Sequence, residues 1–262
     1  MFAGGSLRAL PLARFRPLAR EGLTRPLPAA RMERRSLPPA FPLANFMAEV
    51  FHRKIFLEGR AGRLDSMLWT SPMPDPPCVG VVCHPHPLFG GTMHNKVVYQ
   101  AAKTLHHRGI PVLRFNFRGA GLSEGRHDHG RGEQEDVRAA LDYLAREFPA
   151  KPILLAGFSF GAWVGLRVGC EDARVTRLVG LGIPADNADC DMSYLKTCAK
   201  PKLIIQGGDD TFGSRASVEA LFATMPEPKR LVIIAGVDHF FAGKLNEVGT
   251  AMDAWLDARS ES

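Results

Sequence analysis

Residues 152–170, which read PILLAGFSFGAWVGLRVGC, decide the fold of this chain. The run Pro152–Ala156 is short and apolar, as in a buried strand, and the residues after Gly161 continue as a buried helix. Between them stands Gly157-Phe158-Ser159-Phe160-Gly161, a G-x-S-x-G motif. A strand, this turn and a helix in succession predict that Ser159 occupies the apex of a sharp turn, in a strained backbone conformation.

The residue types around Ser159 indicate what such a turn does. Strand and helix pass so closely that side chains at positions 157 and 161 would collide, and glycine removes that clash. The turn also points the free N–H groups at the start of the helix, including that of Phe160, toward whatever Ser159 attacks. A G-x-S-x-G motif can also be a plain glycine-rich turn, but the strand and helix around it favour a nucleophile elbow.

Length and composition are those of one folded domain. With 262 residues, 45% of them hydrophobic and 23% charged, the chain can bury the core of a large α/β domain. No apolar run approaches the length of a membrane span. The five cysteines are odd in number and none has C-x-x-C spacing, so we expect free thiols in a reducing compartment, which predicts a cytoplasmic protein.

The net charge of +6 is confined to residues 1–46, which hold eight arginines, two glutamates and no lysine. The rest of the chain is balanced, with 25 basic and 25 acidic residues. The body therefore has no charge bias toward nucleic acid or a membrane surface, and we predict neither as a partner.

Residues 1–46 also contain seven prolines and no helical or strand period. Three interpretations are open: a disordered extension, a mitochondrial or plastid targeting segment if the source is eukaryotic, or a mis-assigned start that precedes Met47. We favour the last. The predicted domain is 47–262.

From residue 50 onward the pattern is regular. Two strands, 51–57 and 63–69, are joined by a hairpin signal, and strands then alternate with helices. We expect further strands at 78–83, 110–117, 152–156, 175–183, 202–206 and 231–235, and helices at 95–108, 133–148, 160–170, 215–225 and 240–259. This order predicts a mostly parallel sheet covered on both faces, with the functional loops at the carboxyl ends of the strands.

A serine hydroxyl needs a base, usually a histidine that a carboxylate orients. His239 follows the last predicted strand and is the only histidine after Ser159. Asp209 and Asp210 both follow the strand at 202–206, and the residues alone leave open which one orients the base. Asp238 adjoins His239 and is expected to be a turn residue.

Five segments then carry a resemblance. They read CHPHPLFGGTMHNK (83–96), NFRGAGLSEG (116–125), GFSFG (157–161), QGGDD (206–210) and GVDHFF (236–241). In them the chain, over roughly 47–262, resembles the α/β-hydrolase superfamily. Within that superfamily it is similar to small bacterial serine hydrolases near the dienelactone-hydrolase and prolyl-peptidase-like branches. The resemblance implies an α/β-hydrolase fold, the triad Ser159, Asp210 and His239, and no cofactor.

The resemblance also implies an oxyanion hole, and it locates the region between the sixth and seventh strands where the family often carries a lid. The family's second N–H donor lies just after a His-Gly pair, which is His84-Pro85 here, so the matching donor is His86. Pro87 has no N–H, and Leu88 is the alternative. The lid region, 184–201, is too short for a cap domain, which predicts a shallow, open pocket suited to small or extended substrates.

The prediction is thus a serine hydrolase that cleaves an ester, thioester or amide of a small acyl substrate through an acyl-enzyme on Ser159. Two other classes were weighed, a non-catalytic binding protein of the same fold and, from the loop at 119–121, a dinucleotide-binding oxidoreductase. A metal site at His84, His86 and His94 lacks carboxylates at ligand spacing. We expect solvated positions for the remaining loop and helix-end histidines, which are His106, His107, His127 and His129.

Overall fold

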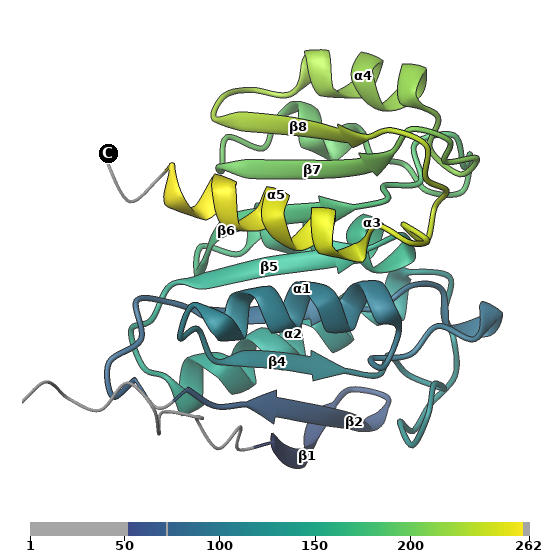
Figure 1. Ribbon diagram of the computed structural model, residues 1–262. Coiled ribbons are helices and arrows are strands. Elements are labelled where there is room, and N and C mark those ends of the chain that lie inside the picture. Colours follow the sequence, from purple (N-terminus) through teal and green to yellow (C-terminus); the bar gives the residue numbers. More distant parts are fainter. Residues whose placement is uncertain (1–51, 72, 259–262) are drawn as a thin grey trace, which may run out of the picture. The chain divides into compact units, whose positions relative to one another are not determined.

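An eight-stranded sheet runs through the part of the chain that the computed structural model describes, which is residues 52–71 and 73–258 (Figure 1). The predicted extension 1–46 lies outside the described residues. The strands stand in the order β1-β2-β4-β3-β5-β6-β7-β8. Their bounds are β1 (His52–Gly59), β2 (Gly62–Trp69), β3 (Val79–Cys83), β4 (Val112–Phe115), β5 (Ile153–Phe158), β6 (Val175–Leu181), β7 (Lys202–Gly207) and β8 (Lys229–Ile234).

The direction of the strands confirms the predicted mixed sheet. β1 and β2 form the antiparallel hairpin, and β2 pairs antiparallel with β4. From β4 to β8 all neighbours are parallel. The central strands β3 and β5 are buried along their whole length, because helices cover both of their faces.

Helices form a layer on each side of the sheet (Figure 1). On one face α1 (Lys96–His107) and α5 (Leu245–Asp257) contribute to the same apolar cluster. On the other face α2 (Arg131–Glu147), α3 (Phe160–Glu171) and α4 (Arg215–Thr224) share a second cluster. The chain between β6 and β7 holds only the short 3-10 helix η2 (Ser193–Lys196). The prediction of a minimal lid in this region is therefore confirmed.

The prediction that the last helix begins at residue 240 is wrong, because α5 begins at Leu245. The Asp238 carboxylate accepts hydrogen bonds from the N–H groups of Phe240 and Ala242, and Phe241 has a φ of 54°. A short acidic side chain that binds nearby backbone N–H groups favours a turn over a helix. Residues 240–244 therefore form a turn beside the predicted active site.

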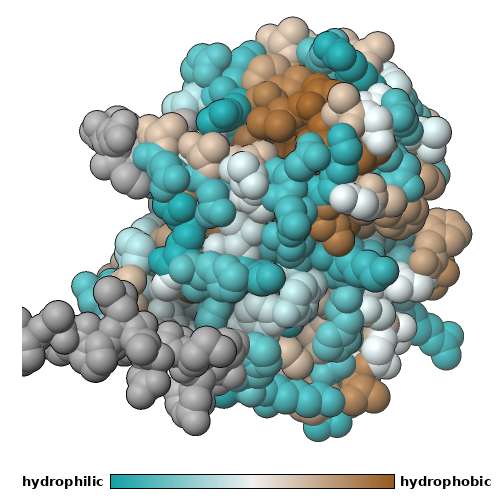
Figure 2. Space-filling view, viewed as in Figure 1, coloured by the Kyte–Doolittle hydropathy of each residue, from teal (hydrophilic) through white to brown (hydrophobic). Residues whose placement is uncertain are grey.

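The outer surface is mostly polar on the face that carries α1 and α5. The largest apolar area that Figure 2 shows on this face lies over β7 and β8, beyond the cover of α5. Leu231, Val232 and Ile233 of the edge strand β8 are half-buried. Among the described residues no helix is both long and apolar enough to cross a membrane.

The central position of β5 generates a stability prediction. Leu155 is fully buried there, so Leu155→Ala should lower the free energy of unfolding by about 2–5 kcal/mol through lost burial and a residual cavity. Leu122 is 60% exposed, and the matched change Leu122→Ala should cost less than about 0.5 kcal/mol. Urea unfolding of both variants measures the difference, and equal losses would contradict this account of the core.

Candidate active site

The predicted nucleophile elbow lies between β5 and α3. Ser159 has φ 55° and ψ −120°, a strained conformation for a residue with a side chain. A Cβ on Gly157 would lie 2.3 Å from the Gly161 carbonyl oxygen, which is the predicted clash between strand and helix. A Cβ on Gly161 would instead lie 2.4 Å from the carbonyl oxygen of His84, just beyond β3. The second glycine is thus required by a neighbouring strand as well as by the turn.

The three predicted triad residues meet at the carboxyl edge of the sheet. Nε2 of His239 lies 2.8 Å from Oγ of Ser159, and Nδ1 of His239 lies 2.7 Å from Oδ2 of Asp210. His239 and Asp210 are 5% and 4% exposed, so bulk water hardly competes for these hydrogen bonds. The arrangement can move a proton from the hydroxyl to the imidazole while the carboxylate stabilises the resulting cation.

The surroundings of the two aspartates explain which one reaches the histidine. Asp210 is buried in the turn that follows β7, and its Oδ1 accepts hydrogen bonds from the N–H groups of Phe212 and Gly213. Its Oδ2 accepts one from the side-chain amide of Gln206, at 2.7 Å. Asp209 is exposed. No function is predicted for Gln206 from the sequence. Its place in the QGGDD segment, four residues before Asp210, is the signal that could have revealed its contact with this carboxylate.

The loop after β3 brings His86 to the same pocket. Phe160 is the first residue of α3, so its N–H has no carbonyl partner within the helix. Among the described residues the N–H of His86 has no acceptor either. The alternative donor, the N–H of Leu88, is already engaged, because it donates to Nδ1 of His86 at 3.2 Å. Phe160 and His86, which both line the pocket over Ser159, thus keep backbone N–H groups without an acceptor among the described residues.

The residues that follow β4 hold this loop in place through hydrogen bonds. The Phe117 N–H donates to Nε2 of the buried His84, at 2.9 Å, and the other ring nitrogen of His84 lies 2.6 Å from the Pro85 carbonyl oxygen. Asn116 accepts a hydrogen bond from the Met93 N–H at 2.8 Å. Both ring nitrogens of His84 are therefore in use, and the His84–His86 pair does not present two free nitrogens to a metal ion.

The expectation of solvated histidines is wrong for His127 and His106. The His127 side chain is 7% exposed, and its ring packs against those of His86 and Phe160, at 4.8 and 5.6 Å between centroids. Its Nδ1 lies 2.8 Å from the buried carboxylate of Glu133, although the geometry is not that of a hydrogen bond. His106 is buried, with Nε2 2.8 Å from the Thr70 carbonyl oxygen. His107 and His129 are exposed as expected.

The glycine-rich loop after β4 does not have the form of a dinucleotide site. Gly119 and Gly121 have φ values of 74° and 55°, and the next helix, α2, begins only at Arg131. A Cβ on Gly121 would lie 2.3 Å from the side chain of Asn116. The loop thus packs on the end of β4 instead of opening a helix that could hold a pyrophosphate.

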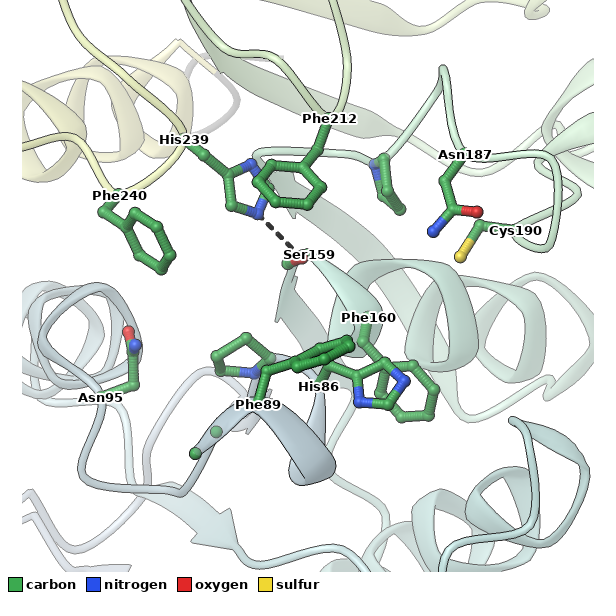
Figure 3. A pocket seen from close by; sticks show the side chains of 14 residues that line it. His86, Phe89, Asn95, Ser159, Phe160, Asn187, Cys190, Phe212, His239 and Phe240 are labelled. Atoms are coloured by element: carbon green, nitrogen blue, oxygen red, sulfur yellow. Dashed lines mark hydrogen bonds between the residues drawn. The ribbon is translucent and has the colours of Figure 1, made fainter.

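A cavity of about 160 Å³ lies over Ser159 (Figure 3). Aromatic side chains make up much of its wall, and three of them are unusually exposed for their size: Phe89 at 87%, Phe240 at 54% and Phe212 at 49%. The Phe212 ring also packs on His239 at 4.6 Å. The site is thus an open apolar pocket with a hydrogen-bonded serine at its base.

Comparisons with known proteins identify a family and several relatives of the chain. A family model described as an alpha/beta hydrolase domain matches residues 78–262. An uncharacterized protein of Rickettsia prowazekii is 37% identical over 210 residues, which are 78% of this chain and 88% of that protein. The solved structure of an alpha-beta serine hydrolase homologue from Coxiella burnetii is 37% identical and covers 76% of this chain and 94% of its own, with a TM-score of 0.71. That of an a/b serine hydrolase without lid from Xanthomonas campestris is 34% identical and covers 84% and 97%, with a TM-score of 0.72.

The buried His84 predicts how stability depends on pH. Burial lowers the pKa of His84 from the usual value near 6.5 to about 4, because the imidazolium would lose its hydration. Between these two values the unfolded chain binds a proton at this residue that the folded chain does not. Stability therefore falls as pH falls through this window, by about 3 kcal/mol in total.

The measurement is urea unfolding of wild-type and His84→Gln protein between about pH 7 and about pH 4.5. The variant, whatever its stability at neutral pH, should show a flatter dependence of the unfolding free energy on pH. An unchanged slope would mean that other groups cause the acid sensitivity.

Proposed function

The chain belongs to the alpha/beta hydrolase family, and on that premise we propose that it is a serine hydrolase. It cleaves an ester, thioester or amide bond of a small acyl substrate through an acyl-enzyme on Ser159. The observation that carries the proposal is the continuous series of hydrogen bonds from Asp210 through His239 to Ser159, at 2.7 and 2.8 Å. The solved relatives with 34% and 37% identity are themselves described as serine hydrolases or their homologues, which supports it further.

In the first half of the reaction the Ser159 oxygen attacks the carbonyl carbon while Nε2 of His239 takes the hydroxyl proton. The carbonyl oxygen becomes an oxyanion that the N–H groups of Phe160 and His86 stabilise, a contribution of about 10²–10³ in rate for each donor. His239 then gives its proton to the leaving group, and the acyl group remains on Ser159.

In the second half, water attacks the acyl-enzyme while His239 takes one of its protons, and the acid product leaves as Ser159 recovers its own. Asp210 keeps Nδ1 of His239 protonated, which leaves Nε2 free to accept. Every step uses groups of this chain, and no cofactor enters the scheme.

The proposed setting is the cytoplasm, with the acyl substrate as partner and neither nucleic acid nor a membrane. Among the described residues every cysteine is a free thiol, which suits a reducing compartment. The charge balance of residues 47–262 supports the absence of a polyanionic partner. Peptides recovered N-terminal to Met47 from native protein would exclude the interpretation of residues 1–46 as a mis-assigned start, and would leave a targeting segment as an alternative.

A fluorophosphonate probe tests the nucleophile directly. We expect labelling at Ser159, located by peptide mass mapping, and its loss in both Ser159→Ala and His239→Ala, because the probe requires an activated hydroxyl. Circular dichroism establishes that the variants are folded. Folded wild-type protein that resists the probe would overturn the proposal and favour a non-catalytic binding protein of the same fold.

The adjacent aspartates offer a matched pair for the third triad position. Asp210→Asn should lower kcat/KM roughly a thousandfold or more, because the amide favours the wrong tautomer of His239. Asp209→Asn changes an exposed side chain, and its kcat/KM should stay within about twofold of wild type. Equal activity of the two variants, measured on one active ester, would remove Asp210 from the mechanism.

A further inference from the structure

The pocket over Ser159 has two different sides. Figure 3 shows Asn187 and Cys190 on one side of Ser159, and Asn95 and Phe240 on the other. His239 stands between Ser159 and Phe240, and the rings of His239 and Phe240 are 5.4 Å apart. The pocket is therefore divided at the reacting hydroxyl, as a substrate is divided at its carbonyl carbon.

The position of His239 assigns a role to each side. In the proposed reaction Nε2 of His239 protonates the leaving group, so the departing atom must come within hydrogen-bond reach of this nitrogen. That places the leaving group on the side of Asn95 and Phe240, called the leaving side below. The acyl group then lies on the side of Asn187 and Cys190, called the acyl side.

The acyl side suits an uncharged group. No lysine, arginine, aspartate or glutamate is among the described residues that line the pocket. Burial raises the pKa of the Cys190 thiol to about 11, and burial together with the nearby His127 lowers the pKa of His86, so both groups are neutral near pH 7. An acyl group with a charge would lose hydration here without gaining an ionic partner.

The size of the cavity limits the acyl group as well. The pocket as a whole, with both sides included, has a volume of about 160 Å³, close to the ~150 Å³ of an engineered apolar cavity that binds benzene. The Phe160 ring is 3% exposed and packs against His86 at 4.9 Å between centroids, so it closes the pocket as a packed apolar wall. The acyl side is a part of this volume, so a group no larger than about one benzene ring fits there and a long acyl chain does not fit within it.

The leaving side is less restrictive. Gly90, Asn95 and Phe240 line the pocket and also a second hollow of about 300 Å³, which includes His94 and Lys96. A leaving group can therefore extend into this second space, where polar side chains are available. Size and charge are limited on one side of the scissile bond and not on the other.

We propose that the enzyme selects for a neutral acyl group no larger than about one benzene ring and tolerates leaving groups of varied size. This inference rests on the proposed function, because it assumes that Ser159 is acylated. It extends that function by assigning specificity to the acyl side.

The first experiment compares kcat/KM for p-nitrophenyl and methylumbelliferyl esters of acetic, pentanoic, benzoic, glutaric and decanoic acid. Benzoate and pentanoate should exceed decanoate and the anionic glutarate, which matches pentanoate in length, by at least about tenfold. The order of the acids should be the same for both leaving groups. Equal use of pentanoate and glutarate, or an order that changes with the leaving group, would overturn the inference.

Two variants then test the assignment of the sides. Cys190→Phe should lower the ratio of kcat/KM for benzoate over acetate at least about tenfold, because the new ring occupies the acyl side. Phe240→Ala, the control on the leaving side, should leave this ratio within about twofold and change the preference between the two leaving groups. A benzoate-to-acetate ratio that Cys190→Phe leaves unchanged would contradict the assignment.

Fluorophosphonate labelling distinguishes a failure of the acyl selectivity from a failure of the proposed function. If the probe labels wild-type and Cys190→Phe protein but kcat/KM does not depend on the acyl group, the acyl selectivity is overturned and the proposed function stays intact. Wild-type protein that neither accepts the probe nor hydrolyses any of the esters would overturn both.

Discussion

The close approach of α3 to the end of β3, at Gly161, is the constraint on which the site depends. A Cβ at this position would lie 2.4 and 2.5 Å from two carbonyl oxygens, those of His84 and Cys83. Because backbone meets backbone here, the first residues of α3 stand beside the loop that follows β3. The free N–H of Phe160 and that of His86 thus come to the same pocket, and Ser159 takes the positive φ that the short turn requires.

The hydrogen bonds of the site converge on one buried carboxylate with a complete set of partners. Asp210 receives hydrogen bonds from the backbone N–H groups of Phe212 and Gly213 and from the amide of Gln206, besides His239. A buried charge is tolerated only when it is paired and hydrogen-bonded in this way. The same turn carries the Phe212 ring that packs on His239, so one segment contributes Asp210, contacts His239 and forms a wall of the pocket.

The loops determine what the pocket admits. The short segment between β6 and β7 leaves Ser159 accessible, and Asn187 and Cys190 from this segment form part of the wall. The opposite wall comes from the loop after β3. Residues that follow β4 anchor this loop, because the Phe117 N–H binds His84 and the Asn116 side chain binds the Met93 N–H. The edge of the sheet thus positions Ser159, Asp210 and His239, whereas the loops set the shape of the pocket around them.

The sequence by itself determined the elements and pointed to the side chains that meet at Ser159. Periodicity and the placement of glycines reflect local structure, so they predicted the hairpin, the alternating strands and helices and the elbow at Ser159. His239 could be singled out because it is the only histidine that follows Ser159 in the sequence. Contacts between distant residues needed the tertiary structure: from the residues alone Asp209 and Asp210 are equivalent, and only folding buries one of them beside the imidazole. The burial of His127 and the two sides of the pocket were decided in the same way, because packing between elements leaves no periodic signal in the chain.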